Sequence, residues 1–67
     1  MSAFSEKMLA LRKARGLTQE EAATECGLTY HSYRRYELGE REPTLSTLLL
    51  LSKFYGVTLD ELAGNDL

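Results

Sequence analysis

The segment from Tyr30 to Tyr36, YHSYRRY, concentrates side chains that form directed hydrogen bonds. The adjacent guanidinium groups of Arg34 and Arg35 each offer several donors in a rigid plane, which suits anionic or acceptor-rich partners. His31 is the single histidine of the chain, and no serine or cysteine has a plausible base beside it. The sequence also lacks a Cys/His cluster and a glycine-rich phosphate cradle. These residue types favour binding over catalysis, so we do not expect an enzyme.

The elements that must position these side chains are predicted as helices that end at glycines, where a left-handed residue is favoured. The glycines that follow segments of helical periodicity are Gly16, Gly27, Gly39, Gly56 and Gly64. The threonines that can cap the next helix are Thr18, Thr29, Thr44 and Thr58, and a glutamate follows the first and last of them at capping-box spacing. No segment alternates like a strand, which predicts an all-α fold. The predicted helices run from about Ser5 to Arg15, Gln19 to Cys26, Tyr30 to Leu38, Leu45 to Tyr55 and Leu59 to Ala63.

Apolar residues recur in these helices at spacings of three and four residues, which places them on one face of each helix. The residues predicted to form a single core are Phe4, Met8, Leu11, Ala22, Ala23, Cys26, Tyr33, Tyr36, Leu45, Leu48, Leu51 and Tyr55. Because Tyr33 and Tyr36 then point inward, the opposite face of their helix must point to solvent. The side chains on that outward face are Tyr30, His31, Arg34 and Arg35, with Ser32 at its edge.

A chain of 67 residues has room for one domain, which we expect to span residues 1–67. A domain of this size is marginal alone, so association with another copy is favourable. The net charge of −2 excludes a uniformly basic nucleic-acid wrapper. Nevertheless, every Lys and Arg except Lys53 lies before Thr44, which predicts a basic end and an acidic end.

A single cysteine, Cys26, cannot form an internal disulfide, which indicates the reducing cytoplasm and a packed thiol. The longest apolar run, Leu48 to Leu51, is far shorter than the ~20 residues of a membrane helix. No basic segment followed by an apolar stretch opens the chain. We therefore expect a cytoplasmic protein without a membrane partner and without a cofactor or metal.

The segment from Gln19 to Tyr36, QEEAATECGLTYHSYRRY, resembles a helix-turn-helix, in which Ala23 permits a close crossing and Gly27 supplies the turn. Its flanks, LRKARGLTQEEAA and YELGEREPTLSTLLLLSKFYGVTLDELAG, are similar to the Cro and phage-repressor-type (XRE-like) family of bacterial regulators, over nearly the whole chain. The resemblance implies a five-helix, repressor-like DNA-binding domain, with the helix-turn-helix over about 18–38 and the last two helices over about 44–64. Without the flanks, two arginines between tyrosines are more typical of a solvated helix face with two core tyrosines than of a DNA-reading helix.

The resemblance implies a sequence-specific transcriptional regulator that inserts its third helix into the major groove of an operator. Occupying the operator would block or assist RNA polymerase, and of the two we favour a repressor. The residues that it implies against base edges are Tyr30, His31, Arg34 and Arg35, among which Arg35 can bond guanine O6 and N7 together. The residues that it implies against the DNA backbone are Gln19, Thr29, Ser32 and Arg41. A phage regulator, an antitoxin and a restriction-modification controller all fit, and so does contact with a toxin or with RNA polymerase.

Arg12 and Glu37 match a family ion pair that joins the first helix to the end of the third, a structural role. The chain departs from the family where Ala22 and Tyr33 stand in place of a leucine and a β-branched residue. This departure suggests that the larger ring fills the space that the smaller side chain vacates.

Glu40 and Glu42 stand in a loop where relatives often carry basic or amide groups, so one copy should bind DNA modestly and with a steep salt dependence. Modest affinity favours a two-fold dimer on a palindromic operator, with recognition helices ~34 Å apart. The residues expected at the dimer interface are Leu49, Leu50, Phe54, Leu62 and Leu67, although the first two could instead complete the core.

A competing interpretation is a protein-interaction module, such as an antitoxin or an anti-repressor partner, that keeps this scaffold with weak or no DNA binding. The net charge of −2 and the carboxylates of Glu40 and Glu42 favour it. The exposed pair Arg34 and Arg35 argues against it.

Overall fold

The computed structural model describes residues 3–64, which form helices and no strand. The helices are α1 (Ala3–Ala14), α2 (Gln19–Cys26), α3 (Tyr30–Leu38), α4 (Leu45–Tyr55) and α5 (Leu59–Ala63). The predicted all-α fold is confirmed, and only α1 differs from its predicted bounds. It begins two residues before Ser5 because Phe4 already packs against the core, so the first turn is stabilised by burial.

A threonine hydroxyl caps the N-terminus of four of these helices. Thr18 Oγ1 accepts the Glu21 N–H at 3.1 Å, and the Glu21 carboxylate accepts the Thr18 N–H at 2.9 Å, which completes the predicted capping box. The hydrogen bond from the Thr18 backbone lowers the pKa of Glu21. Thr29, Thr44 and Thr58 likewise accept the N–H three residues further on, as predicted.

Gly27 forms the turn between α2 and α3. Its φ of 82° lies in the left-handed region, and its N–H donates to the carbonyls of Ala23 and Thr24. All five glycines predicted to end helices have positive φ. At Gly64 space is limiting as well, because a Cβ there would lie 2.6 Å from Ala3 Cβ. The end of α5 therefore packs directly on the start of α1.

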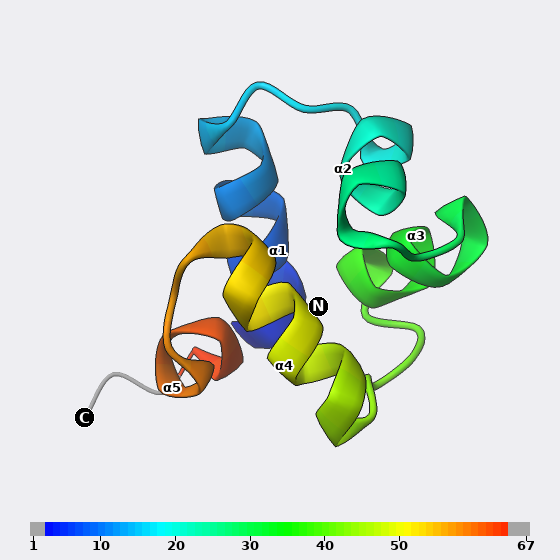
Figure 1. Cartoon of the computed structure of the whole chain (residues 1–67). Helices are drawn as coiled ribbons and strands as arrows, with labels where there is room; N and C mark the ends of the chain where they lie inside the picture. The colour runs from blue at the N-terminus through cyan, green and yellow to red at the C-terminus, as the bar shows by residue number, and fades with distance from the viewer. Residues whose placement is uncertain (1–2, 65–67) are drawn as a thin grey trace.

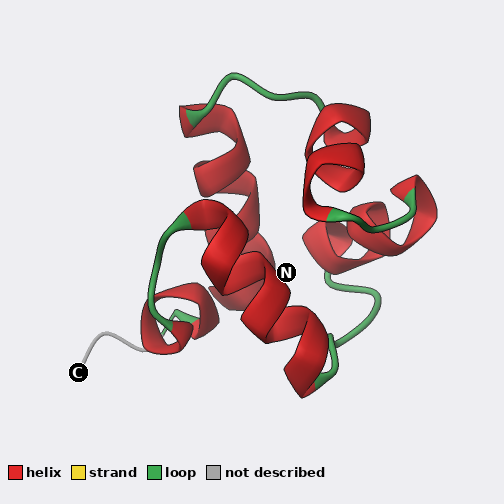
Figure 2. Ribbon diagram, in the orientation of Figure 1, coloured by secondary structure: helices red, strands yellow, loops and turns green. Residues whose placement is uncertain are grey.

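The helices enclose one core. Figure 1 shows α2 and α3 on one side of the molecule and α5 on the other, with α1 and α4 between them. α3 packs on α1 and α2, whereas α5 packs on α1 and α4, and only loops and turns join the helices (Figure 2). The buried apolar residues are Met8, Ala22, Ala23, Cys26, Tyr33, Tyr36, Leu51, Tyr55 and Leu62.

Three apolar residues of the C-terminal half lie elsewhere than predicted. Leu45, predicted in the core, is 66% exposed, because the first turn of α4 extends beyond the neighbouring helices (Figure 1). Leu62, predicted at a dimer interface, is fully buried, because α5 turns it toward α1 and α4. Phe54, predicted at the same interface, packs against the core beneath the Arg15 guanidinium. Leu67 lies outside the described residues.

Cys26 is buried, and burial raises the pKa of its thiol, which confirms the prediction of a packed cysteine. Within residues 3–64, no group of three or more His, Cys, Asp and Glu side chains could hold a metal ion. No helix in this range has the length and apolar character needed to cross a membrane.

Arg12 and Glu37 form an ion pair that ties α1 to α3. Arg12 Nε donates to Glu37 Oε2 at 2.7 Å, and Arg12 Nη2 donates to Glu37 Oε1 at 3.0 Å. Gln19 Nε2 of α2 donates to the same Oε1 at 3.3 Å, and Arg12 Nη1 donates to the Leu17 carbonyl at 2.8 Å. The hydrogen bond to Glu37 raises the pKa of Arg12. Because the Glu37 side chain is only 3% exposed, these donors provide the hydrogen bonds that water would otherwise supply.

Replacing Arg12 with methionine should lower the free energy of unfolding by about 3 kcal/mol, because it leaves the buried Glu37 carboxylate without its cation. Thermal unfolding followed by circular dichroism measures this loss. Lys13→Met removes the neighbouring exposed cation and serves as the control, with little expected shift of the midpoint. Equal midpoints for the two variants would contradict the structural role of the ion pair.

Candidate nucleic-acid interface

The outer face of α3 carries the side chains predicted to contact bases. Tyr30, His31, Arg34 and Arg35 are all exposed, and their spacing places them on one side of the helix. The rings of Tyr30 and His31 lie 5.8 Å apart between centroids, at the start of α3. The structure thus brings the four residues together on a single polar surface that contains two cations.

Three of the residues predicted against the DNA backbone lie at the starts of α2 and α3. Thr29 is exposed, and its Oγ1 accepts the Ser32 N–H at 3.2 Å, so this hydroxyl already caps α3. Ser32 is half-buried beside it. Gln19 opens α2 with its amide engaged by Glu37. The Thr29 hydroxyl and the Gln19 amide are therefore held in place by hydrogen bonds within the fold.

A shallow hollow joins the two helix starts. The residues that line it are Arg12, Thr18, Gln19, Glu20 and Tyr30. Helix N-termini present N–H groups without partners inside the helix, which favour anions. The Glu20 carboxylate, which lines the same hollow, opposes an anion there.

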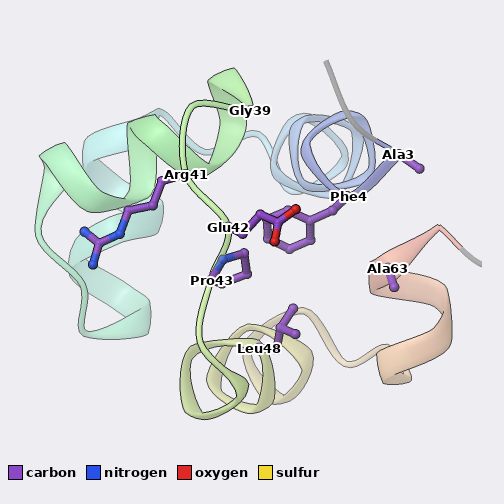
Figure 3. A pocket seen from close by; sticks show the side chains of 8 residues that line it. All are labelled: Ala3, Phe4, Gly39, Arg41, Glu42, Pro43, Leu48 and Ala63. Carbon is purple, nitrogen blue, oxygen red and sulfur yellow. The ribbon is translucent and has the colours of Figure 1, made fainter.

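The loop between α3 and α4 separates its charges. Arg41, the fourth residue predicted against the backbone, is exposed and lies with its guanidinium 5.9 Å from the Tyr36 ring centroid. Arg41 also lines a pocket of about 300 Å³ between this loop, α1, α4 and α5, although its guanidinium extends away from Phe4 and Leu48 (Figure 3). Glu42 lines that pocket together with Phe4 and Pro43. The loop thus presents its cation on the side of α3.

The inner face of α3 is held by a buried tyrosine pair. The Tyr33 and Tyr55 hydroxyls form a hydrogen bond that links α3 to α4. Tyr33 is fully buried and Tyr55 is 5% exposed. Burial raises the pKa of both phenols, and the negative charge of Glu37 raises it further. Ala22 is also fully buried. Burial of both residues is what we expect if the Tyr33 ring fills space that the small Ala22 side chain leaves.

The spacing of apolar residues predicted both tyrosines in the core but gave no sign of their hydrogen bond. The available signal is the residue type, because a buried phenol hydroxyl needs a partner whereas phenylalanine does not. Tyr33 and Tyr55 occur on different helices, so spacing along the chain could not pair them.

α2 and α3 are two short helices joined at a glycine turn. The second exposes a polar face, and hydrogen bonds on its inner face hold it to the other helices. This arrangement defines a helix-turn-helix protein. Comparison with known families agrees, since residues 8–62 match the family model described as helix-turn-helix. The chain belongs to the helix-turn-helix family, which confirms the resemblance seen in the sequence.

Similar proteins are named as bacterial or phage regulators and not as enzymes. The chain is 44% identical over 62 residues to the cryptic phage CTXphi transcriptional repressor RstR of Vibrio cholerae, covering 92% of the chain and 56% of that protein. It is 44% identical over 59 residues to the uncharacterized HTH-type transcriptional regulator YqaE of Bacillus subtilis, covering 88% and 51%. It is 35% identical over 63 residues to the HTH-type transcriptional activator BcrR of Enterococcus faecalis, covering 94% and 31%.

The chain therefore spans about half the length of the first two of these relatives, and less of the third. No solved structure gives a significant match.

The raised pKa values of Tyr33 and Tyr55 predict a loss of stability in alkaline solution. A tyrosine in the unfolded chain has a pKa of about 10, so above this pH the unfolded state releases protons that the folded state retains. The free energy of unfolding should be unaffected by these groups below about pH 10 and should decrease above it. Urea unfolding at about pH 8 and about pH 11 measures the decrease, which should be smaller in the double variant Tyr33→Phe/Tyr55→Phe. An equal decrease in both proteins would contradict the role of the buried pair.

Proposed function

We propose that this protein is a sequence-specific transcriptional regulator, a repressor that binds a palindromic DNA operator as a dimer. The observation that carries this proposal is the outer face of α3, where Arg34 and Arg35 are exposed beside Tyr30 and His31. A helix of nine residues is roughly 14 Å long, and the major groove, about 12 Å wide, accepts a helix of this kind.

Each side chain of this face has a role that its chemistry permits. Arg35 bonds guanine O6 and N7 with two parallel donors, and Arg34 contacts a neighbouring base or phosphate. Tyr30 packs its ring on a thymine methyl group, and His31 donates or accepts a single hydrogen bond. The residues that we assign to the DNA backbone are Gln19, Thr29, Ser32 and Arg41.

The name of one relative supports repression in a phage context, whereas BcrR is named an activator. RstR is named a phage transcriptional repressor, and the chain matches it along 92% of its own length. This match favours a phage or prophage repressor over an antitoxin or a restriction-modification controller. It also favours operator DNA over a toxin as the partner, and an RNA polymerase contact stays a prediction.

An apolar surface on α4 supports pairing of two copies. Leu45, Leu49 and Leu50 are 66%, 44% and 39% exposed. Leu45 and Leu49 are four residues apart and therefore lie on the same side of the helix, with Leu50 next to them. Clustered exposed leucines are typical of a protein interface. Because Leu62 is buried, we assign the dimer interface to these three residues of α4.

Leu49→Glu tests the dimer, because a carboxylate at the centre of an apolar interface loses its hydration without gaining a partner. Sedimentation equilibrium should show a dimer for the unmodified chain and a monomer for this variant. Leu59→Glu, which places the same charge at an exposed leucine of α5, is the matched control and should remain dimeric. A monomer at high concentration for the unmodified chain would remove the dimer from the proposal.

Selection of random duplex DNA by the purified protein tests the function itself. We expect an enriched palindrome whose affinity falls steeply as salt rises. Arg35→Ala should weaken binding to this duplex by about 1–3 kcal/mol and relax the preference at one base pair. Lys53→Ala, which removes an exposed cation of α4, should leave the preference unchanged.

Failure to enrich any sequence at low salt would contradict DNA recognition. That outcome would favour the protein-interaction module, which a net charge of −2 and the exposed leucines of α4 would suit.

A further inference from the structure

The inner face of α3 has two anchor points, one helical turn apart. Glu37 is bonded to Arg12 of α1 and to Gln19 of α2. Tyr33, four residues earlier and therefore on the same side of the helix, is bonded through its hydroxyl to Tyr55 of α4. A helix held at one point can still turn about that point, whereas two anchors restrict both its rotation and its tilt.

Tyr55 is itself a rigid partner. Its ring lies 4.7 Å from that of Phe54 in an edge-to-face arrangement with an interplanar angle of 65°. The guanidinium carbon of Arg15, in the turn after α1, lies 5.3 Å from the Tyr55 ring centroid and 5.0 Å from that of Phe54. Both kinds of contact are attractive, so turning the Tyr55 ring would break its contact with Arg15 and its contact with Phe54. Its hydroxyl is therefore presented to Tyr33 at a defined place.

The rotation of α3 determines where its outward side chains point. Arg34 and Arg35 follow Tyr33 directly, so any rotation of Tyr33 about the helix axis moves both guanidinium groups. A rotation of about 15° carries a group about 6 Å from the axis through about 1.6 Å, roughly half the length of a hydrogen bond. A bidentate contact with a base would not survive such a displacement.

We infer that Tyr55 is a positioning residue for base recognition, because its hydroxyl, bonded to that of Tyr33, sets the rotation of the recognition helix. The inference rests on the proposed function, and it gives a buried side chain of α4 an effect on which DNA sequence is bound. Losing this hydroxyl removes no charge from the DNA-facing surface. Attraction to phosphates, which depends on those charges, should therefore persist while discrimination between sequences declines.

The experiment compares the full chain with Tyr55→Phe on two duplexes, one enriched by the unmodified protein and one of the same composition in shuffled order. Both dissociation constants are measured well below the melting midpoint of each protein. Tyr55→Phe should reduce the ratio between them about tenfold, which corresponds to 1.4 kcal/mol. Its affinity for the shuffled duplex and the salt dependence of that affinity should stay unchanged. Tyr36→Phe is the control: it removes a different phenol hydroxyl, on α3, and keeps the hydrogen bond between Tyr33 and Tyr55. This variant should show the same ratio of dissociation constants as the unmodified protein.

A purely structural role for Tyr55 would lower the melting midpoint and leave the ratio unchanged, which would overturn the inference. If Tyr55→Phe does not fold, the double variant Tyr33→Phe/Tyr55→Phe replaces it, because no buried hydroxyl then lacks a partner. The double variant should show the same loss of ratio, and a full ratio would again overturn the inference. If the unmodified protein enriches no sequence, the proposed function itself fails and this inference fails with it.

Discussion

The buried carboxylate of Glu37 is the constraint on which the arrangement of the helices depends. A charged group with 3% exposure is tolerated only when cations and hydrogen-bond donors surround it. Arg12 provides the cation from α1, and Gln19 adds a donor from α2. The Glu37 side chain of α3 therefore requires α1 and α2 to pack next to it. Arg12 also bonds the Leu17 carbonyl, so the same guanidinium orients the chain as it enters α2.

This arrangement gives α3 a bonded inner face and an exposed polar outer face. Tyr33 and Glu37 face inward and form hydrogen bonds to the other helices. Arg34 and Arg35 face outward, are exposed and lie outside the core. Since the support is independent of the outer face, the exposed side chains of α3 can differ between related proteins without destabilising the fold. The glycine turn at Gly27 makes the division possible, because it lets α3 cross α2 with one face turned away.

Local chemistry explains why so much of the fold could be predicted from the sequence. Capping by a threonine hydroxyl and termination by a left-handed glycine both act within a few residues, so the bounds of α2 to α5 follow from neighbours along the chain. The outward face of α3 could also be predicted, because turning Tyr33 and Tyr36 inward leaves Arg34 and Arg35 outside. The start of α1 was missed because packing of Phe4, and not a cap, extends it.

The sequence by itself therefore determined the helices, their order, the polar face of α3 and, through its resemblance to a family, the ion pair between α1 and α3. Only the tertiary structure decided which apolar residues are covered, burying Leu62 and leaving Leu45 exposed. It also decided that the hydroxyls of Tyr33 and Tyr55 meet. The physical reason is that periodicity places a residue on a face of its own helix, whereas burial and long-range hydrogen bonds depend on which other helix covers that face.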